Sequence, residues 1–258
     1  MGVLDLNILI IIIFLYGLTL GSFYNVVGLR VPIKQSIVKP RSSCPNCKHQ
    51  LTAMELIPVL SYIIQGGKCR QCKARISPIY PMMELITGLL FVSAPLVVGW
   101  TAELVVAWTL ISLLIIIFVT DITYMLIPDK ILAVFAGIFL IERLLIPLSP
   151  WWDSLLGAAI GFTLLLVIAI ISKGGMGGGD IKLFALIGFI IGTKAMVLAF
   201  FLATLYGSLF GIVGLLLKKV KRGKPIPFGP FIAAGTLTAY YFYDAIIEAY
   251  LQYLTSGF

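Results

Sequence analysis

Long apolar stretches dominate this sequence and restrict it to one architectural class. Of the 258 residues, 60% are hydrophobic and 12% charged, and the mean hydropathy is +1.07, a balance far from that of a soluble domain. About 20 apolar residues cross a bilayer as a helix, which satisfies its own backbone hydrogen bonds. Apolar stretches lie at about residues 8–29, 80–99, 103–120, 130–147, 154–172, 181–192, 195–217 and 229–251. We predict an all-α, multi-pass membrane protein with about eight transmembrane helices, the sixth too short to cross unless its flanks are helical.

Basic residues are distributed unevenly along the chain. Between Arg30 and Arg75, nine lysines or arginines accompany a single acid, Glu55. A second acid-free basic cluster covers residues 218–224. The positive-inside rule places both segments in the cytoplasm.

If the chain crosses the membrane eight times, the charge rule also decides on which side two acidic residues lie, Asp121 and Asp180. The junctions that follow Asp121 and precede Asp180 both face the cytoplasm, whereas Arg143 and Lys194 are minor exceptions to the charge rule. The basic residues flank spans, where they set orientation and attract anionic lipid, and no nucleic-acid recognition motif accompanies them. The partner that we expect is therefore the lipid bilayer and not a nucleic acid.

All four cysteines lie in the loop between the first and second predicted spans. They form two CxxC pairs, Cys44 with Cys47 and Cys69 with Cys72. In a reducing cytoplasm this spacing is typical of tetrahedral zinc, which is favoured over disulfides or free structural cysteines. Four thiolates leave no position for water, so the zinc would be structural and would fold a zinc-ribbon-like loop too small to build its own core.

Asp121 and Asp180 each lie where an apolar stretch meets a polar junction. An ionisable residue at such a place is a candidate for function. Two carboxylates that share a proton supply a general base for water and a general acid for the leaving amine, because like charges about 3 Å apart cannot both ionise. The only histidine is His49, which excludes a Ser-His-Asp triad or an HExxH metalloprotease.

The functional role of Asp121 has a competing candidate, Asp129, and Asp180 also has a purely structural explanation. Asp129, after a proline and before the fourth span, is a natural N-cap, whereas Asp121 ends a helix where the dipole disfavours a carboxylate, which makes Asp121 the better functional candidate. Asp180 is equally well explained as the N-cap of the sixth span. The glycine-rich residues 174–179 lack the GK[ST] of a phosphate loop, and they would allow an extended substrate strand to lie close to the backbone.

In their order along the chain, the motifs resemble the type IV prepilin peptidase family, the GxGD-type intramembrane aspartic proteases of bacteria. The resemblance covers nearly the whole chain. It includes residues 21–27, the two CxxC pairs around residues 56–58, residues 67–72, residues 80–84, Asp121 with residues 127–129, residues 177–180 and residues 227–230.

The resemblance implies that Asp121 and Asp180 form the catalytic dyad and that Gly177 and Gly179 are the glycines of the GxGD motif. It implies cleavage of basic leader peptides from prepilins or pseudopilins at the cytoplasmic face of the bacterial plasma membrane, in pilus assembly or protein secretion. Many members also methylate the new N-terminus with S-adenosylmethionine. Glu55 and Gly67 match the loop positions of that activity, although the loop has no glycine-rich dinucleotide-binding pattern.

Three segments follow from these inferences: a first transmembrane helix (residues 1–30), a cytoplasmic zinc loop (31–78) and transmembrane peptidase helices that carry the aspartates (79–258). One alternative is a non-enzymatic transporter or scaffold, in which the acids bind protons or ions and the zinc loop docks a partner. Another is a methyltransferase alone, with structural aspartates. The sequence alone explains the presence of Glu55 in this basic loop most simply by a salt bridge with a neighbouring base.

Overall fold

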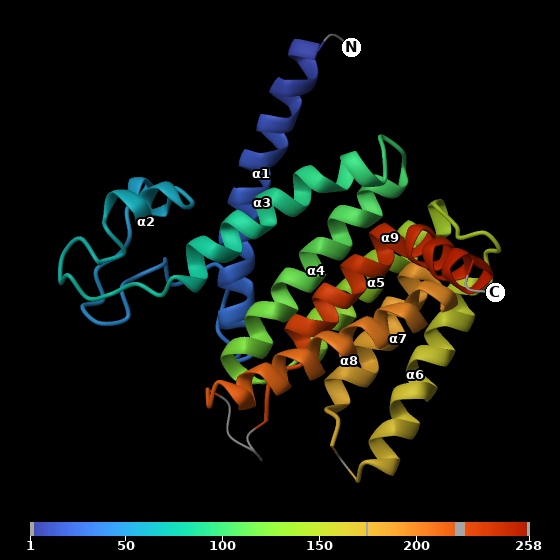
Figure 1. Ribbon diagram of the computed structural model, residues 1–258. Coiled ribbons are helices and arrows are strands. Elements are labelled where there is room, and N and C mark those ends of the chain that lie inside the picture. The colour runs from blue at the N-terminus through green and yellow to red at the C-terminus, as the bar shows by residue number, and fades with distance from the viewer. Residues whose placement is uncertain (1–2, 174, 220–224, 257–258) are drawn as a thin grey trace. The chain divides into compact units, whose positions relative to one another are not determined.

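The computed structural model describes residues 3–173, 175–219 and 225–256, and this part of the chain contains eight long helices and no strand (Figure 1). Each predicted apolar stretch coincides with one helix, which confirms the all-α prediction. The helices are α1 (Val3–Arg30), α3 (Ile79–Val97), α4 (Glu103–Tyr124), α5 (Asp129–Leu145), α6 (Asp153–Ile171), α7 (Gly178–Ile191), α8 (Thr193–Leu216) and α9 (Gly229–Ser256). A short 3-10 helix, η1 (Ala53–Leu56), and a short helix, α2 (Leu60–Ile64), lie in the loop after α1.

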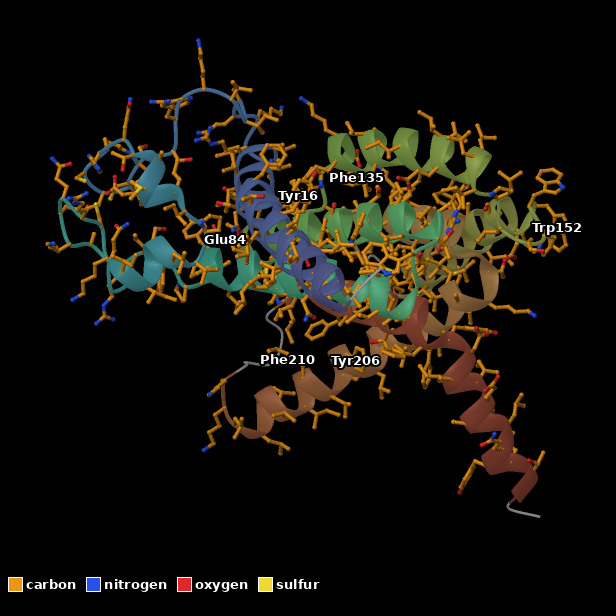
Figure 2. All side chains as sticks on the ribbon, turned by 90° about the horizontal axis from the view of Figure 1, so that it is seen from above. Tyr16, Glu84, Phe135, Trp152, Tyr206 and Phe210 are labelled. Atoms are coloured by element: carbon orange, nitrogen blue, oxygen red, sulfur yellow. The ribbon has the colours of Figure 1, made fainter. Side chains whose placement is uncertain are left out.

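Not every helix is able to cross a bilayer by itself. Within the described residues, α1, α3, α4, α6 and α8 are both long enough and apolar enough. Helix α7 has only 14 residues, as the short sixth stretch predicted, and α9 is interrupted at Phe242. Large apolar side chains such as that of Phe210 on α8 are exposed (Figure 2), as expected where the surrounding solvent is lipid.

The chain divides into two compact units, residues 1–120 and 121–258. In the first unit, α1 packs closely on α3. A Cβ on Gly17 would lie 2.8 Å from the Cα of Gly88, and a Cβ on Gly21 would lie 2.8 Å from the Cα of Glu84. Glycines at these contacts therefore allow the two helices to approach.

The same unit holds the cysteine loop, which is tied to α3 through Glu84 (labelled in Figure 2). The buried Glu84 accepts a 2.8 Å hydrogen bond from the backbone N–H of Val59. Val59 has a φ of 60° and a ψ of −51°, and Leu60 N–H bonds to the carbonyl of Pro58 at 2.6 Å, which together form a γ-turn. The loop thus has a fixed attachment at the start of α2.

In the second unit, glycines bring α6 and α7 into backbone contact. Gly157 faces Gly188, and a Cβ on either residue would overlap the other's backbone. Small residues therefore pack these two helices together.

Helix α7 ends at Ile191 and is capped by Gly192, whose φ of 79° suits a residue without a Cβ. The buried Arg143 of α5 donates to the carbonyl of Ile190 through Nε at 2.8 Å and Nη2 at 2.5 Å. Asp153 accepts a 3.2 Å bond from the first backbone N–H of α8, that of Thr193. The charged groups of these two residues therefore satisfy backbone atoms at the break between α7 and α8.

Candidate active site and metal centre

Asp121 lies in the last turn of α4 and is buried. Its Oδ2 accepts a 2.6 Å hydrogen bond from the backbone N–H of Gly229, and the backbone of Phe228 also bonds to the carboxylate. These N–H groups lie at the start of α9, where the first donors have no partner within the helix and the dipole is positive. A carboxylate that is disfavoured at the end of its own helix is therefore held by the beginning of another. The sequence pattern did not reveal this pairing, although residues 227–230 were part of the resemblance.

Asp180 is the third residue of α7, whose N-cap is Gly177. The alternative explanation, that Asp180 is itself the N-cap, is wrong, because the helix begins two residues earlier. The backbone of Gly177 hydrogen-bonds to the Asp180 carboxylate, and the charge of Asp121 acts on Asp180. The second unit thus brings the two predicted catalytic carboxylates within electrostatic reach of each other.

The glycines before Asp180 have different surroundings. A Cβ on Gly179 would lie 2.7 Å from the Cβ of Ile127, whereas one on Gly178 would meet nothing within 4 Å. Gly179 therefore allows the first turn of α7 to approach the segment that joins α4 to α5. Gly177 has an ordinary φ of −71°, and a Cβ there would lie 3.1 Å from Asp180 Oδ2. Gly174 lies outside the described residues, and binding of a substrate strand by this stretch stays a prediction.

Asp129, the rival of Asp121, is the first residue of α5, and the N-cap is Pro128. The prediction that Asp129 is the N-cap is therefore wrong. Its exposed carboxylate forms an ion pair with Lys182 Nζ, at 2.8 and 2.9 Å. Pairs of this kind contribute about 0–1 kcal/mol. A partner on α7 thus accounts for Asp129 without a chemical role.

The four cysteines converge on one point in the first unit. All are free thiols, and their Sγ atoms lie within 4.8 Å of one another, with 3.7 Å between Cys44 and Cys72 and 3.9 Å between Cys47 and Cys69. A tetrahedral zinc with Zn–S bonds of about 2.3 Å requires sulfur pairs about 3.8 Å apart. The cluster therefore has the donor atoms and spacing of a four-cysteine metal site.

Both CxxC turns fold in the same way. The backbone N–H of the first cysteine donates to a carbonyl five residues later, from Cys44 to His49 at 2.9 Å and from Cys69 to Ala74 at 2.8 Å. The residue after each second cysteine, Lys48 or Lys73, has a φ of 60°. The local backbone therefore presents two matching pairs of thiols.

Nearby polar groups favour the thiolate form of two of these cysteines. The backbone N–H of Ala74 and the side chain of Asn46 lower the pKa of Cys72 to about 6. The backbone N–H groups of Cys47 and Asn46 lower the pKa of Cys44. For Cys47 the backbone N–H of His49 acts in the same direction, but burial and the other three thiols outweigh it and raise the pKa to about 11. Thiolates are the form that binds metal, so these hydrogen bonds prepare Cys44 and Cys72 for an ion, whereas Cys47 would lose its proton to the metal.

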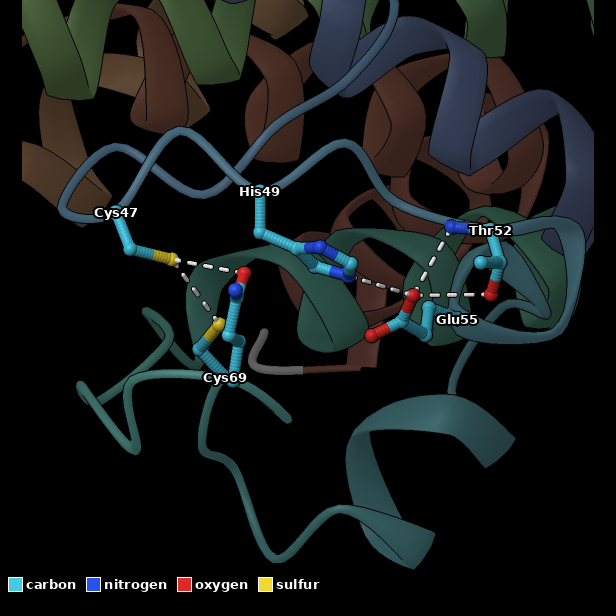
Figure 3. A network of polar contacts seen from close by, with 6 residues as sticks. Cys47, His49, Thr52, Glu55 and Cys69 are labelled. Atoms are coloured by element: carbon cyan, nitrogen blue, oxygen red, sulfur yellow. Dashed lines mark hydrogen bonds and ion pairs between the residues drawn. The ribbon is translucent and has the colours of Figure 1, made fainter.

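Glu55 lies in η1 and is 8% exposed. Its Oε2 accepts bonds from the Thr52 N–H at 3.0 Å and the Thr52 hydroxyl at 2.9 Å, and lies 3.2 Å from His49 Nε2 (Figure 3). The N–H of Thr52, with its hydroxyl and His49, holds the pKa of Glu55 below its usual range. The neighbouring base that pairs with this carboxylate is a histidine and not one of the lysines or arginines of the loop. The network links Glu55 to His49, which directly follows the first CxxC turn.

Gly67 contacts different residues from those around Glu55. Its φ is 68°, its N–H donates to the carbonyl of Tyr62 at 2.9 Å, and a Cβ there would lie 2.9 Å from the Tyr62 hydroxyl. Glycine is therefore required here both by the backbone conformation and by the neighbouring side chain.

Comparisons with known proteins agree with the motifs. Residues 15–98 match the Bacterial Peptidase A24 N-terminal domain, and residues 108–212 match the Type IV leader peptidase family. A Prepilin leader peptidase/N-methyltransferase of Bacillus subtilis (strain 168) is 50% identical over 93% of this chain and 97% of its own. Proteins of the same name are 35% identical in Aeromonas salmonicida, over 93% of both chains, and 33% identical in Pseudomonas aeruginosa, over 93% of this chain and 92% of the relative. No solved structure gives a significant match. The resemblance is confirmed, and this chain belongs to the type IV leader peptidase family.

Proposed function

We propose that this protein is an aspartic endopeptidase that removes the basic leader peptide from prepilins or pseudopilins. The observation that carries the proposal is that the charge of Asp121 acts on Asp180 within one unit, with Asp121 held by the start of α9. One carboxylate, ionised, takes a proton from water, and the other, protonated, gives a proton to the leaving amine. The backbone N–H groups at Asp121 and Asp180 orient both carboxylates for these transfers.

The charge pattern supports an orientation for this chemistry. The loop of residues 31–78 carries most of the bases, so we place it and the two aspartates on the cytoplasmic side of the bacterial plasma membrane. In this arrangement residues 1–30 anchor the chain, residues 31–78 form the metal loop and residues 79–258 carry the peptidase. The substrate's apolar helix would remain in the bilayer while its leader is cut at the boundary.

For the metal centre, we propose structural zinc held by Cys44, Cys47, Cys69 and Cys72. The sulfur spacing and the lowered pKa values of Cys44 and Cys72 fit this ion. Its expected effect is to keep the loop folded, because a metal that binds only the folded form stabilises it. Zinc near one per chain in purified protein, lost when all four cysteines become serine, is the expected result. Zinc that persists in the fourfold variant would refute the site.

The names of the relatives support a second activity, N-methylation of the new N-terminus. S-adenosylmethionine supplies an electrophilic methyl group when bound. We place this activity in the cysteine loop, with Glu55 and Gly67 as its candidate residues. The test is transfer of labelled methyl from S-adenosylmethionine to a cleaved prepilin by the wild type. No transfer under conditions where cleavage proceeds would remove this activity from the proposal.

The test of the peptidase is cleavage of a model prepilin by purified protein in detergent. Asp121→Asn and Asp180→Asn each keep the size of the side chain and remove the acid, so we expect a loss of about 10²–10⁴-fold. Asp129→Asn is the matched control, because Asp129 lies in an exposed ion pair, and it should cleave at close to the wild-type rate. Full cleavage by both of the first two variants would exclude the dyad.

A further inference from the structure

The short helix α2 of the cysteine loop has an apolar face that is exposed. Leu60, Ile63 and Ile64 lie on one side of this helix, at positions i, i+3 and i+4, and their exposed fractions are 56%, 66% and 82%. Tyr62 lies on the opposite side and faces the loop, because a Cβ on Gly67 would be 2.9 Å from its hydroxyl. One side of α2 thus packs on the loop, and the other presents three large aliphatic side chains outward.

The stretch around α2 exposes no charged side chain. In residues 51–67 the only acidic or basic residue is Glu55, which is buried. Met54, in the same stretch, is exposed, and the nearest bases are Lys48 before it and Lys68 after it. An exposed apolar segment with basic flanks is typical of a segment that lies in the interface of an anionic bilayer.

The attachment of α2 to α3 gives the depth of this apolar face. Helix α3 is able to span the membrane, and its 19 residues rise about 28 Å, close to the hydrocarbon core of about 30 Å. Neither end of α3 therefore projects far into water. Glu84 is the sixth residue of α3, about 8 Å along the axis from its start, and accepts a 2.8 Å hydrogen bond from the N–H of Val59. Because Val59 directly precedes α2, this bond holds α2 at the level of the acyl chains.

Two unusual features are explained by the same contact. A carboxylate within a spanning helix is costly unless it is paired, and Glu84 has both the N–H of Val59 and a hydrogen bond with the side chain of Ser22 on α1. A φ of 60° is an outlier for a β-branched residue such as Val59, and it persists only where the surroundings hold it. In Figure 1, α2 lies level with the middle of α1 and not beyond its C-terminal end. The attachment therefore places α2 beside the spanning helices.

We propose that residues 54–64 form a membrane anchor, which inserts into the leaflet on the side of the cysteine loop. Leu60, Ile63 and Ile64 lie among the acyl chains, and Lys48 and Lys68 lie at anionic headgroups. The partner of this surface is lipid, and the anchor holds the cysteine loop against the bilayer. The proposal goes beyond the peptidase and methyltransferase activities and depends on neither.

The test is photo-crosslinking of the full-length protein in liposomes of phosphatidylcholine and phosphatidylglycerol. The photoreactive residue p-benzoylphenylalanine replaces Ile64 in the test variant. In the control it replaces Gln71, an exposed residue of the second CxxC turn. Irradiation should attach lipid at residue 64 and not at residue 71, as measured by mass spectrometry.

The attachment to α3 is tested in the same experiment. Glu84→Leu removes the acceptor for the N–H of Val59, and should cause the loss of most lipid adducts at residue 64. Glu84→Gln keeps an acceptor oxygen in the same place, and should retain them. Equal adduct yields in these two variants would show that the bond to Glu84 does not set the depth of α2.

Other occupants of the apolar face give other products. A cross-linked dimer in place of lipid adducts would make the face an interface between two copies of the chain, and a cross-link to added prepilin would make it a substrate site. Either result overturns the anchor, as does the absence of any adduct at residue 64 or equal lipid labelling at residue 71. If the variant at Ile64 aggregates on size-exclusion chromatography, the probe is placed at Leu60, one turn earlier on the same face.

Discussion

The carboxylate of Asp121 and the backbone N–H of Gly229 form a 2.6 Å hydrogen bond across 108 residues of sequence. The contact leaves no room for a side chain at position 229, where a Cβ would lie 2.8 Å from the Cβ of Asp121 and 2.9 Å from its Oδ2. Asp121 therefore has a fixed position relative to α9.

Gly229→Ala is the first variant that follows from this contact. The added methyl group must push Asp121 aside, and a displacement of about 1 Å at a reacting group can cost 10²-fold in rate. We expect prepilin cleavage to fall by about that factor while the protein still inserts and folds. Gly137→Ala, whose Cβ would meet nothing within 4 Å, is the control. Equal cleavage rates in the two variants would show that the contact has no effect on the reaction.

Gly178 and Gly179 provide a comparison between adjacent glycines. Gly179→Ala would place its Cβ 2.7 Å from that of Ile127, whereas Gly178→Ala would meet open space. We expect the first variant to lose most cleavage and the second to keep it. Adding Ile127→Ala to Gly179→Ala should restore part of the rate, because the shorter side chain makes room. Rates measured on one prepilin substrate decide this, and a Gly178→Ala variant as inactive as Gly179→Ala would contradict the steric explanation.

Arg143 of α5, which donates to a carbonyl near the end of α7, is expected to stabilise the folded protein. Arg143→Met removes the donors to the carbonyl of Ile190, and we expect a loss of about 2–3 kcal/mol in the free energy of unfolding, since hydrogen bonds to charged groups contribute about 1.5–3 kcal/mol. Arg143→Lys should be intermediate, because an ammonium group cannot reproduce the fork of two donors. Thermal unfolding in detergent measures both. Lys194→Met, at an exposed position, is the control, and an equal loss there would contradict a specific role for Arg143.

The ionisation of Glu55 should make the stability of the cysteine loop depend on pH. Its pKa is lowered in the folded loop, so its stabilising effect is fully present above the unfolded pKa of about 4.3 and is lost as the pH falls through the lower folded value. Hydrogen exchange at the Thr52 amide, corrected for the intrinsic rate, should therefore be slow near neutral pH and fast in acid. In Glu55→Gln it should be fast at both.

The Leu51 amide, which donates to the carbonyl of Ser42 at 2.9 Å, is the internal reference for that experiment. Its protection should change little between the wild type and Glu55→Gln. If Thr52 remains equally protected in the variant at neutral pH, the ionised carboxylate does not hold this turn.

The positions of the long helices were predictable because each depends on a continuous apolar stretch. The cysteine cluster was predictable for a similar reason, since each CxxC turn is local. The contacts of Asp121 with Gly229 and of Arg143 with Ile190 were not, because hydropathy carries no information on which helix ends meet. A signal was present in the position of Asp121, at the end of a helix where a carboxylate requires compensation from elsewhere.

The two wrong N-caps have a common cause. A single acid before an apolar stretch predicts a cap at the acid itself, but in both cases the residue in extended conformation lies earlier. Pro128, with φ −73° and ψ 127°, precedes Asp129, and Gly177, with φ −71° and ψ 140°, precedes Asp180 by three residues. Helix starts are fixed by backbone conformation, which the identity of one polar side chain does not determine.

The short length of α7 has a consequence for the membrane around this protein. Its 14 residues rise about 21 Å, against a hydrocarbon core of about 30 Å. Asp180 lies near one end, and Arg143 and Asp153 hold charge at the other, so neither end can be buried deep in acyl chains without cost. The bilayer does not have to match this length, because most of α7 is buried among its neighbours, and Asp180 can therefore lie below the headgroups, where a hydrophilic leader meets the apolar helix of its substrate.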